Sequence, residues 1–398
     1  MCLANTAGHV ASPPGCTVAD VIRIGLPSYV RQHKMPAHHH KVLGAIAKCR
    51  TAEMGGHLFQ CTECGKQHKV AHGCGDRHCP NCQGRAARLW LEKQREALLP
   101  VPYFHTVFTL PHTLNPLVRY NQKALYKLLF DCAGATLLEF GRNRFGGTTG
   151  VTAVLHTWSQ QLSGHYHLHC IVPGGGWSTQ TGRWTSAGPN YCFPVKALSK
   201  VFRAKYRDGL WELFNQGKLD LSGSGASCAT RADFRKLMAE LLSKDWVVYS
   251  KRPFGGPEQV LAYLSRYTHR VAIGDARILA IDKAAKTVTF HYRDYADASK
   301  KKTATLKIED FIHRFRLHIL PPHFCKIRHY GILSNAKRKA NIEAIRTVIG
   351  SVDASTLQHQ SVSEVAQIPL CPHCKSDSLV LIAKRPHRHF NSTPSQPP

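Results

Sequence analysis

A short segment of the chain carries two Cys-x-x-Cys pairs, Cys61 with Cys64 and Cys79 with Cys82. This spacing lets a tight turn direct both sulfurs of a pair at one tetrahedral metal ion. The surrounding residues 49–83 are rich in Cys, His and Gly and poor in large apolar side chains, so they cannot build a core without metal. We therefore predict a zinc-binding module. The alternative, that these cysteines are reduced and buried thiols, fits the polar, Gly-rich setting poorly.

Further cysteines and histidines leave the ligand set open. The 14 residues between the pairs are slightly fewer than the usual ribbon gap of about 15 to 20 residues. Additional groups in the same segment could complete a second zinc site: Cys49, His57, Cys74 and His78. A weaker half-site, Cys371-x-x-Cys374, has His387 and His389 as candidate partners, or none. Residues 341–398 are predicted to form a C-terminal tail that is partly disordered.

The distribution of apolar residues predicts an α+β fold. Strands are predicted for segments rich in β-branched and aromatic residues: 103–110, 151–159, 167–172 and 246–249. Helices are predicted at 21–48 with a break at Pro36, and at 85–99, 117–140, 194–212, 232–243 and 258–270. Because these elements lack a regular βαβ repeat, we expect a central, largely antiparallel sheet with flanking helices. The expected domains are 1–100 with the zinc module, 101–340 with the sheet, and the tail.

Alternating histidines mark the predicted strand at 167–172. Side chains alternate along a strand, so His165, His167 and His169 project from one face, and neighbouring pairs are close enough to share a metal ion. The alternative is a half-exposed strand with a polar face. We interpret His167 and His169 as metal ligands, and the third ligand is either His165 or His156.

Two tyrosines, Tyr263 and Tyr267, are four residues apart in the predicted helix 258–270. At that spacing both phenols lie on one helix face, which suits packing residues equally well. Basic neighbours favour a functional interpretation, because they would bind phosphate beside two possible nucleophiles: Arg266, His269 and Arg270.

The charge balance indicates a polyanionic partner. The chain has 53 Lys and Arg against 25 Asp and Glu, a formal net charge of +28. Because the basic residues are spread along the chain, nucleic acid fits better than a membrane surface. Pro13, Pro14 and Asp20 interrupt the region where a signal peptide would be apolar, and no long apolar run is present, so we expect a soluble, intracellular protein. The scarcity of acidic residues disfavours a carboxylate-triad, two-metal site.

Several motifs resemble those of a known family. His167-Leu168-His169 resembles the histidine–hydrophobic–histidine (HUH) motif of rolling-circle nucleases, and Tyr263 with Tyr267 resembles their two-tyrosine motif. More specifically, the chain resembles the rolling-circle transposases of the insertion sequence 91 family. The stretches that carry this resemblance are in the family's order: CRT (49–51), RHCPNCQ (77–83), HTWSQQLSGHYHLHCIVPGGG (156–176), YLSRYTHRVAI (263–273) and RFRLHILPPHFCKIRHYGILSN (314–335).

The resemblance implies an HUH nuclease domain that acts in DNA transposition. A tyrosine would attack a phosphodiester of single-stranded DNA, and the 5′ end would be held as phosphotyrosine until strand transfer. Tyr263 and Tyr267 would be the nucleophiles, and His167 with His169 would bind a catalytic Mg²⁺ or Mn²⁺ ion, although imidazole ligands usually favour zinc and other transition ions. The zinc module would hold DNA.

The resemblance also implies a cellular location, and two other functional classes are considered beside it. A bacterial transposase would be cytoplasmic and, when bound to DNA, associated with the nucleoid. A related enzyme class is the HUH replication initiator or relaxase, which the zinc module disfavours. A non-catalytic, zinc-dependent DNA-binding protein would explain the charge and the cysteines, but would leave the histidine and tyrosine motifs unexplained.

Overall fold

The computed structural model describes residues 16–188, 192–251, 259–260, 271–350 and 370–385. The chain divides into two compact units. The first unit comprises Met1–Arg85, Ile273–Arg316 and His359–Pro398, and the second comprises Ala86–Ala272 and Leu317–Gln358. This division differs from the predicted domains 1–100, 101–340 and 341–398, because segments distant in sequence pack with the N-terminal helices and the zinc module.

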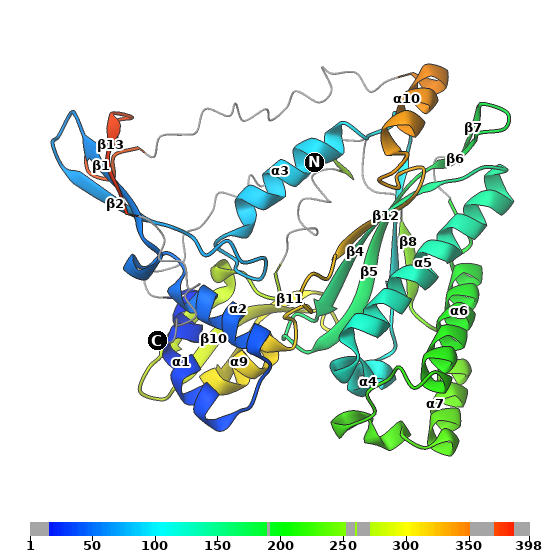
Figure 1. Cartoon of the computed structure of the whole chain (residues 1–398), viewed down its shortest axis with the longest axis horizontal. Helices are drawn as coiled ribbons and strands as arrows, with labels where there is room; N and C mark the ends of the chain where they lie inside the picture. Colours follow the sequence, from blue (N-terminus) through cyan, green and yellow to red (C-terminus); the bar gives the residue numbers. More distant parts are fainter. Residues whose placement is uncertain (1–15, 189–191, 252–258, 261–270, 351–369, 386–398) are drawn as a thin grey trace, which may run out of the picture. The chain divides into compact units, whose positions relative to one another are not determined.

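An antiparallel sheet forms the centre of the second unit (Figure 1). Its strand order is β12-β4-β5-β3-β8, with β3 at Tyr103–Thr109, β4 at Gly150–Trp158, β5 at Gly164–Pro173, β8 at Val248–Lys251 and β12 at Ile327–Gly331. The β-branched and aromatic side chains that predicted these strands suit a pleated, half-buried surface. The predicted α+β fold with an antiparallel sheet is therefore confirmed.

Helices cover one face of this sheet. α5 (Gln122–Phe145) and α6 (Val195–Asn215) pack against it and against each other. Tyr166, Leu168 and Cys170 of β5 are buried in the core that includes side chains of both helices, so the residues between them face the opposite side of the sheet. Further elements assigned mainly to this unit are α3 (Gln83–Arg95), η2 (His112–Leu114), α4 (Asn115–Tyr120), β6 (Gly175–Ser178), β7 (Arg183–Ser186), η3 (Gly223–Cys228), α7 (Arg231–Ser243) and α10 (Arg338–Ile349).

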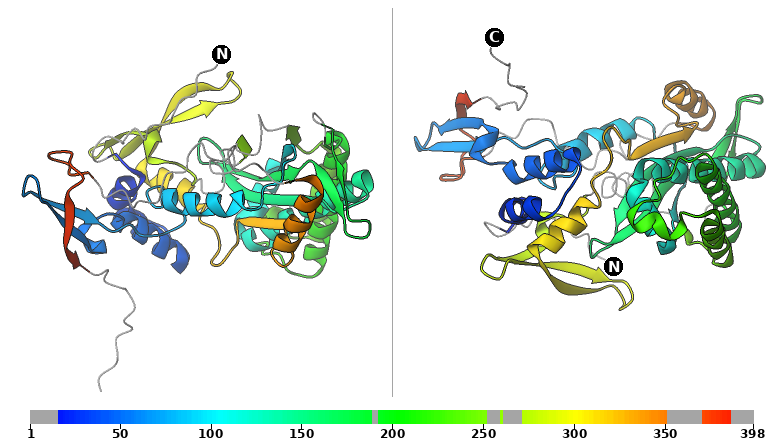
Figure 2. Two further views of the ribbon diagram at one scale, coloured as in Figure 1. Left: turned by 90° about the horizontal axis from the view of Figure 1, so that it is seen from above. Right: turned by 60° about the horizontal axis from the view of Figure 1, so that its bottom comes forward.

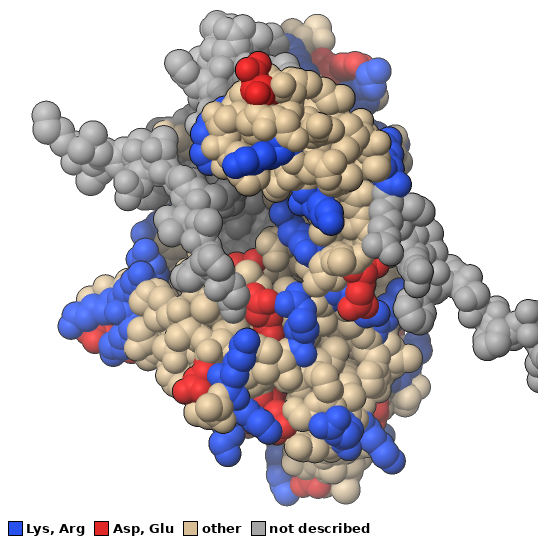
Figure 3. Space-filling view, turned by 90° about the vertical axis from the view of Figure 1, so that its left-hand side faces the viewer, with Lys and Arg blue, Asp and Glu red and all other residues tan. Residues whose placement is uncertain are grey.

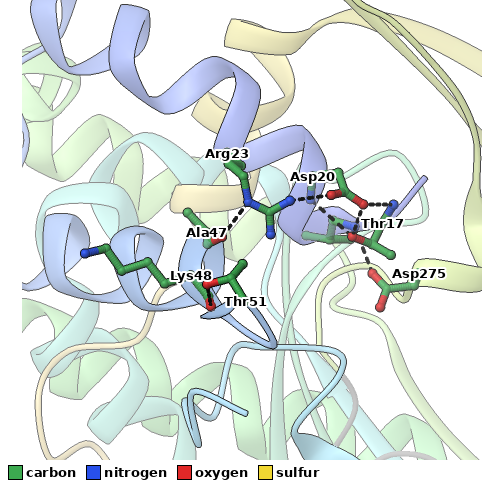
Figure 4. Close-up of polar contacts among 8 residues, drawn as sticks. Thr17, Asp20, Arg23, Ala47, Lys48, Thr51 and Asp275 are labelled. Atoms are coloured by element: carbon green, nitrogen blue, oxygen red, sulfur yellow. Dashed lines mark hydrogen bonds and ion pairs between the residues drawn. The ribbon is translucent and has the colours of Figure 1, made fainter. Parts of the chain in front are cut away.

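The first helix of the first unit begins at a well-formed cap. α1 (Val18–Gln32) follows Thr17, whose side chain accepts a hydrogen bond from the Asp20 amide, while the Asp20 carboxylate accepts one from the Thr17 amide (Figure 4). The Val18 amide donates to the Asp275 carboxylate at 2.8 Å. These contacts satisfy amides at the helix start, and one of them ties the helix to a segment more than 250 residues later.

Two other helices pack on α1 in the described part of this unit. Arg23 donates to the carbonyl oxygen of Ala47 in α2 (Ala37–Lys48) at 2.9 Å, as Figure 4 shows. α9 (Ile308–Arg316) approaches α1 at Gly25, where any Cβ atom would collide with Ile308. The predicted break at Pro36 is confirmed. A three-stranded antiparallel sheet precedes α9, and Figure 2 shows it in yellow. Its strands are β9 (Ile278–Asp282), β10 (Thr287–Asp294) and β11 (Lys300–Lys307), and the short helix η4 (Asp275–Arg277) comes before them.

A sheet from both ends of the chain forms the zinc module. After η1 (Ala52–Met54), the hairpin of β1 (Gly56–Cys61) and β2 (Gln67–Ala71) is joined by β13 (Leu379–Arg385). β13 pairs antiparallel with β1, and the three strands lie together in both views of Figure 2. β13 lies within the segment 341–398 that the sequence analysis assigned to a partly disordered tail. Local composition does not reveal a strand whose partner is more than 300 residues away. Residues 386–398 lie outside the described residues.

The described surface is rich in basic side chains. Figure 3 shows Lys and Arg dispersed over the face that it displays, without a single basic block. Of the helices that the structure describes, none is both long and apolar enough to cross a membrane.

Candidate active site and zinc clusters

Three histidines converge on the face of the central sheet opposite α5 and α6. His156 of β4 is directly opposite His167 of β5 in the strand register, and His169 follows two residues later on the same face. Among the described residues, these three offer ring nitrogens that all lie within 4.8 Å of one another. The centre of the His156 ring is 5.4 Å from that of His167 and 4.4 Å from that of His169. The antiparallel register thus builds the cluster.

Hydrogen bonds orient two of these rings. Nδ1 of His167 donates to the backbone carbonyl oxygen of His165 at 2.9 Å, which leaves Nε2 as the ligand atom. Nδ1 of His169 lies 2.9 Å from Nε2 of His105 on β3, and these two rings are stacked with centres 5.1 Å apart. Such partners fix the tautomer and direction of a metal-binding imidazole. His105 was missed by the sequence analysis, because its role depends on β3 lying beside β5.

Burial keeps the imidazoles of His167 and His105 neutral at neutral pH. Desolvation, with a smaller contribution from the His165 ring, lowers the pKa of His167 to about 3. Desolvation also lowers the pKa of His105 to about 4. A neutral imidazole presents the lone pair that a metal ion needs. Three nitrogen ligands with further positions for water or substrate suit a divalent transition ion, and fit Mn²⁺ or Zn²⁺ better than Mg²⁺.

His165, the other candidate third ligand, lies beside His167, with ring centres 4.7 Å apart, and its ring is also stacked on His112 of η2, with centres 5.4 Å apart. It does not belong to the set whose ligand atoms all lie within 4.8 Å of one another. Of the alternatives left open by the sequence, His156 is the residue that the structure groups with both His167 and His169.

A first sulfur cluster joins Cys49, Cys74, Cys79 and Cys82, whose Sγ atoms lie within 4.8 Å of one another. The Sγ separations are 3.6 Å for Cys49–Cys82 and Cys49–Cys79 and 3.8 Å for Cys74–Cys82. A tetrahedral ion with Zn–S bonds of about 2.3 Å places its sulfurs about 3.8 Å apart. A Cβ at Gly73 would lie 2.9 Å from Sγ of Cys82, so a glycine there lets the backbone approach.

Hydrogen bonds among the four thiols stabilise one thiolate of this cluster. Hydrogen bonds from the thiols of Cys74 and then Cys79 hold the pKa of Cys49 far below its usual range. The backbone amide of Cys74 also donates to Sγ of Cys49 at 3.4 Å. One thiolate is thus stabilised by its neighbours, and a divalent ion would stabilise all four.

The structure does not bring the two N-terminal Cys-x-x-Cys pairs together. Cys61 and Cys64 lie with Cys371 and Cys374, in a second cluster, and not with the pair at 79–82. The reason is the hairpin: Cys61 is at the turn end of β1, whereas the later pair follows the other end of β2. Five strand residues span about 17 Å, too far for one ion to bridge.

Two histidines considered as zinc ligands lie outside both sulfur clusters. Nε2 of His57 is 3.5 Å from Nε2 of His72. Nδ1 of His78 is 2.9 Å from the Asp76 carboxylate. The cysteine sets are complete without them.

Comparisons with known proteins found two family models and two relatives. A family model described as “Putative transposase” matches residues 150–340, and one described as “Transposase zinc-binding domain” matches residues 21–110. The chain is 38% identical over 380 residues to “Putative transposase y4qJ” of Sinorhizobium fredii, covering 92% of this chain and 95% of that protein. It is 30% identical over 291 residues to the “Transposase for insertion sequence element IS801” of Pseudomonas savastanoi pv. phaseolicola, covering 72% and 68%.

The chain belongs to the insertion sequence 91 family of transposases. Its partner is accordingly DNA, which agrees with the net charge of +28. The cysteine cluster at 49–82 lies within the segment matched as a zinc-binding domain, so zinc is its ion. No solved structure matches this transposase.

The predicted tyrosines of the transposase, Tyr263 and Tyr267, lie outside the described residues, as do Arg266, His269 and Arg270. The preceding described residue, Val260, is 1% exposed and belongs to the same buried cluster as Tyr103 and Ile171. Ile171 follows His169 by two residues in β5 and shares its face of the sheet.

Proposed function

We propose that this transposase cleaves and rejoins single-stranded DNA through a 5′-phosphotyrosine intermediate, in rolling-circle-type transposition. His156, His167 and His169 hold the catalytic divalent ion, and Tyr263 and Tyr267 are the nucleophiles. The observation that carries the proposal is the group of three imidazoles on the sheet face that lacks the α5 and α6 cover. Three protein ligands leave coordination positions for a substrate, which is the pattern of catalytic metal sites.

Val260 is the last described residue before the tyrosines. It is buried in the cluster that contains Ile171, and Tyr263 follows it by three residues in the sequence. The basic neighbours Arg266, His269 and Arg270 support a nucleophilic role for the phenols, because they would bind phosphate beside them.

The proposed reaction uses the residues as follows. The phenolate oxygen of a tyrosine attacks the phosphorus, the bond to the 3′ oxygen breaks, and that oxygen leaves as a 3′-OH after taking a proton. A free phenol has a pKa near 10 and is a weak nucleophile at neutral pH. The ion, when bound, polarises the scissile phosphate. Arg266, His269 and Arg270 bind the flanking phosphates.

Rejoining follows from the same chemistry. A 3′-OH attacks the phosphotyrosine, the tyrosine oxygen leaves, and a phosphodiester is restored. Because the covalent bond keeps the phosphodiester energy, no nucleotide cofactor is needed. A second tyrosine permits a second link at the same time. The zinc module holds DNA during these steps, in the cytoplasm and at the nucleoid of the bacterium.

A covalent adduct assay tests the proposal. The full-length protein is incubated with a 5′-labelled and a 3′-labelled single-stranded oligonucleotide from an element end, with Mn²⁺, Mg²⁺ or Zn²⁺, and separated on a denaturing gel. We expect a protein adduct with the 3′-labelled strand only, since the 5′ end of the downstream fragment is held. Absence of any adduct with every ion would favour a DNA-binding protein without nuclease activity.

A further inference from the structure

The second sulfur cluster is made by the two ends of the chain. Cys61, Cys64, Cys371 and Cys374 have Sγ atoms within 4.8 Å of one another. Sγ of Cys61 is 3.5 Å from that of Cys374, and Sγ of Cys64 is 3.7 Å from that of Cys371. These separations are close to the edge of a zinc tetrahedron, about 3.8 Å, and well above a disulfide bond of about 2.05 Å.

The two Cys-x-x-Cys loops of this cluster have the same backbone design. In the first, the Gly65 amide donates to the carbonyl oxygen of Cys61 at 2.9 Å, and Gly65 has φ of 68°. In the second, the Lys375 amide donates to the carbonyl oxygen of Cys371 at 2.8 Å, and Lys375 has φ of 65°. A left-handed conformation is unfavourable for lysine, so the loop geometry imposes it.

The same equivalence extends one residue further. The Cys61 amide donates to the carbonyl oxygen of Lys66 at 3.0 Å, and the Cys371 amide donates to that of Ser376 at 2.7 Å. In each loop, the first cysteine thus makes two backbone hydrogen bonds to the residues that follow the pair, one through its amide and one through its carbonyl oxygen, and this forms a tight turn of the zinc-knuckle type. Two such knuckles facing each other supply the four thiolates of a closed tetrahedral site.

Neighbouring elements hold the two loops together. β1 and β13 are paired antiparallel, with Cys61 opposite Leu379. The hydroxyl of Ser376 lies 3.3 Å from the sulfurs of both Cys61 and Cys374, where it can donate to a thiolate. Cys61 and Cys371 are fully buried in a small cluster with Leu379. With so few apolar side chains, this sheet needs a further source of stability.

We propose that Cys61, Cys64, Cys371 and Cys374 bind a second, structural zinc ion, which fastens the C-terminal strand β13 to the N-terminal hairpin. Neither family match, at 21–110 or at 150–340, includes the C-terminal pair. The site closes a loop between cysteines 307 residues apart in sequence, so it is completed only after the C-terminal segment has been synthesised. The proposal does not depend on the nuclease chemistry.

Zinc stoichiometry of the full-length protein tests this site. All chains compared carry His167→Ala, so that the histidine cluster does not contribute zinc. After dialysis in reducing buffer, elemental analysis should give two zinc ions per chain for H167A. Adding C371S/C374S should leave one. The matched control adds Cys325→Ser, which removes an exposed cysteine outside both clusters and should leave two. One ion in H167A, or two after C371S/C374S is added, would overturn the proposal.

A second measurement uses only the wild type and is therefore independent of folding in the variants. The zinc-loaded protein is alkylated with iodoacetamide before and after chelator treatment, and the peptides are examined by mass spectrometry. Cys374 and Cys325 are both exposed, so their rates can be compared directly. We expect Cys374 to be protected at least tenfold until zinc is removed, and Cys325 to react in both states. Equal rates in the zinc-loaded protein, or recovery of Cys371 or Cys374 in a disulfide, would contradict the site.

Discussion

The histidine cluster and the cysteine clusters are both small groups of metal-binding side chains, but they are built for different purposes. Each cysteine cluster has four thiols, and the cluster of Cys61 and Cys371 has few apolar side chains around it. The histidine cluster has three imidazoles, supplied by neighbouring strands of a sheet with a large core of its own. A closed set stabilises a fold, whereas an open set leaves room for a substrate. We therefore expect loss of metal from a cysteine cluster to affect folding, and loss of metal from the histidine cluster to affect the reaction.

The largest effect should come from the first cysteine cluster. Replacing the buried Cys79 by Ser removes one of four ligands, so we expect loss of that zinc ion and unfolding of the zinc module. Elemental analysis and circular dichroism measure both. If C79S keeps its zinc, its circular dichroism spectrum and its affinity for DNA, the first cysteine cluster does not stabilise the fold.

The histidine cluster should respond in the opposite way. His167→Ala should reduce adduct formation by more than about 100-fold, since it removes a ligand of the ion that stabilises transition-state charge. The fold and the DNA affinity should be preserved, because binding rests on many phosphate contacts. His165→Ala is the matched control, since its backbone carbonyl, which accepts the bond from His167, is retained. If H167A forms the adduct at the wild-type rate, or if H165A loses as much adduct formation as H167A, then His167 is not a ligand of the catalytic ion.

A weaker effect is expected at His105, which positions His169 through the 2.9 Å hydrogen bond. Replacing His105 by Phe keeps an aromatic ring and removes the nitrogen, and loss of such a partner lowers metal affinity by about 10- to 100-fold. Titration of cleavage with Mn²⁺ should show a higher half-saturating concentration and nearly unchanged activity at saturation. An unchanged half-saturating concentration of Mn²⁺ would show that His105 packs beside His169 without affecting metal binding.

The smallest effect concerns stability in acid. Burial lowers the pKa of His318 from 6.5 to about 4, and its ring bonds the Thr157 hydroxyl and the carbonyl oxygen of Leu162. The unfolded chain binds this proton more readily, so stability falls as pH drops from about 6.5 towards 4, by about 2 kcal/mol at pH 5. The melting temperature of His318→Gln should depend less on pH over that range than that of the wild type. Parallel curves would exclude His318 as the cause.

The sequence predicted local features well and non-local ones poorly. The strands at β3, β4 and β5 and the break at Pro36 follow from side-chain shape and alternation, which act within a few residues. The third histidine stayed open between His156 and His165, because strand register decides it. That register includes an irregularity between His156 and Trp158, which no single segment specifies.

The cysteine sets illustrate the same limit. Their spacing marked the Cys-x-x-Cys pairs as candidate ligands, but the partners of each pair depend on where the hairpin ends and on which strand joins it. For Cys371 and Cys374 the sequence offered His387 and His389, or no partner, and these two histidines lie outside the described residues. Tertiary pairing across 300 residues carries no local signal.

Peptide mapping of the adduct after trypsin digestion, in the wild type and in the Y263F/Y267F double variant, shows whether Tyr263 and Tyr267 form the covalent link to DNA. Phenylalanine keeps the ring and its packing but removes the nucleophile. We expect a nucleotide on a peptide containing Gln259–Arg266 or Tyr267–Arg270, and no adduct in a double variant with wild-type thermal stability. A nucleotide on another residue, or an adduct that persists in the double variant, would exclude the two tyrosines as the nucleophiles.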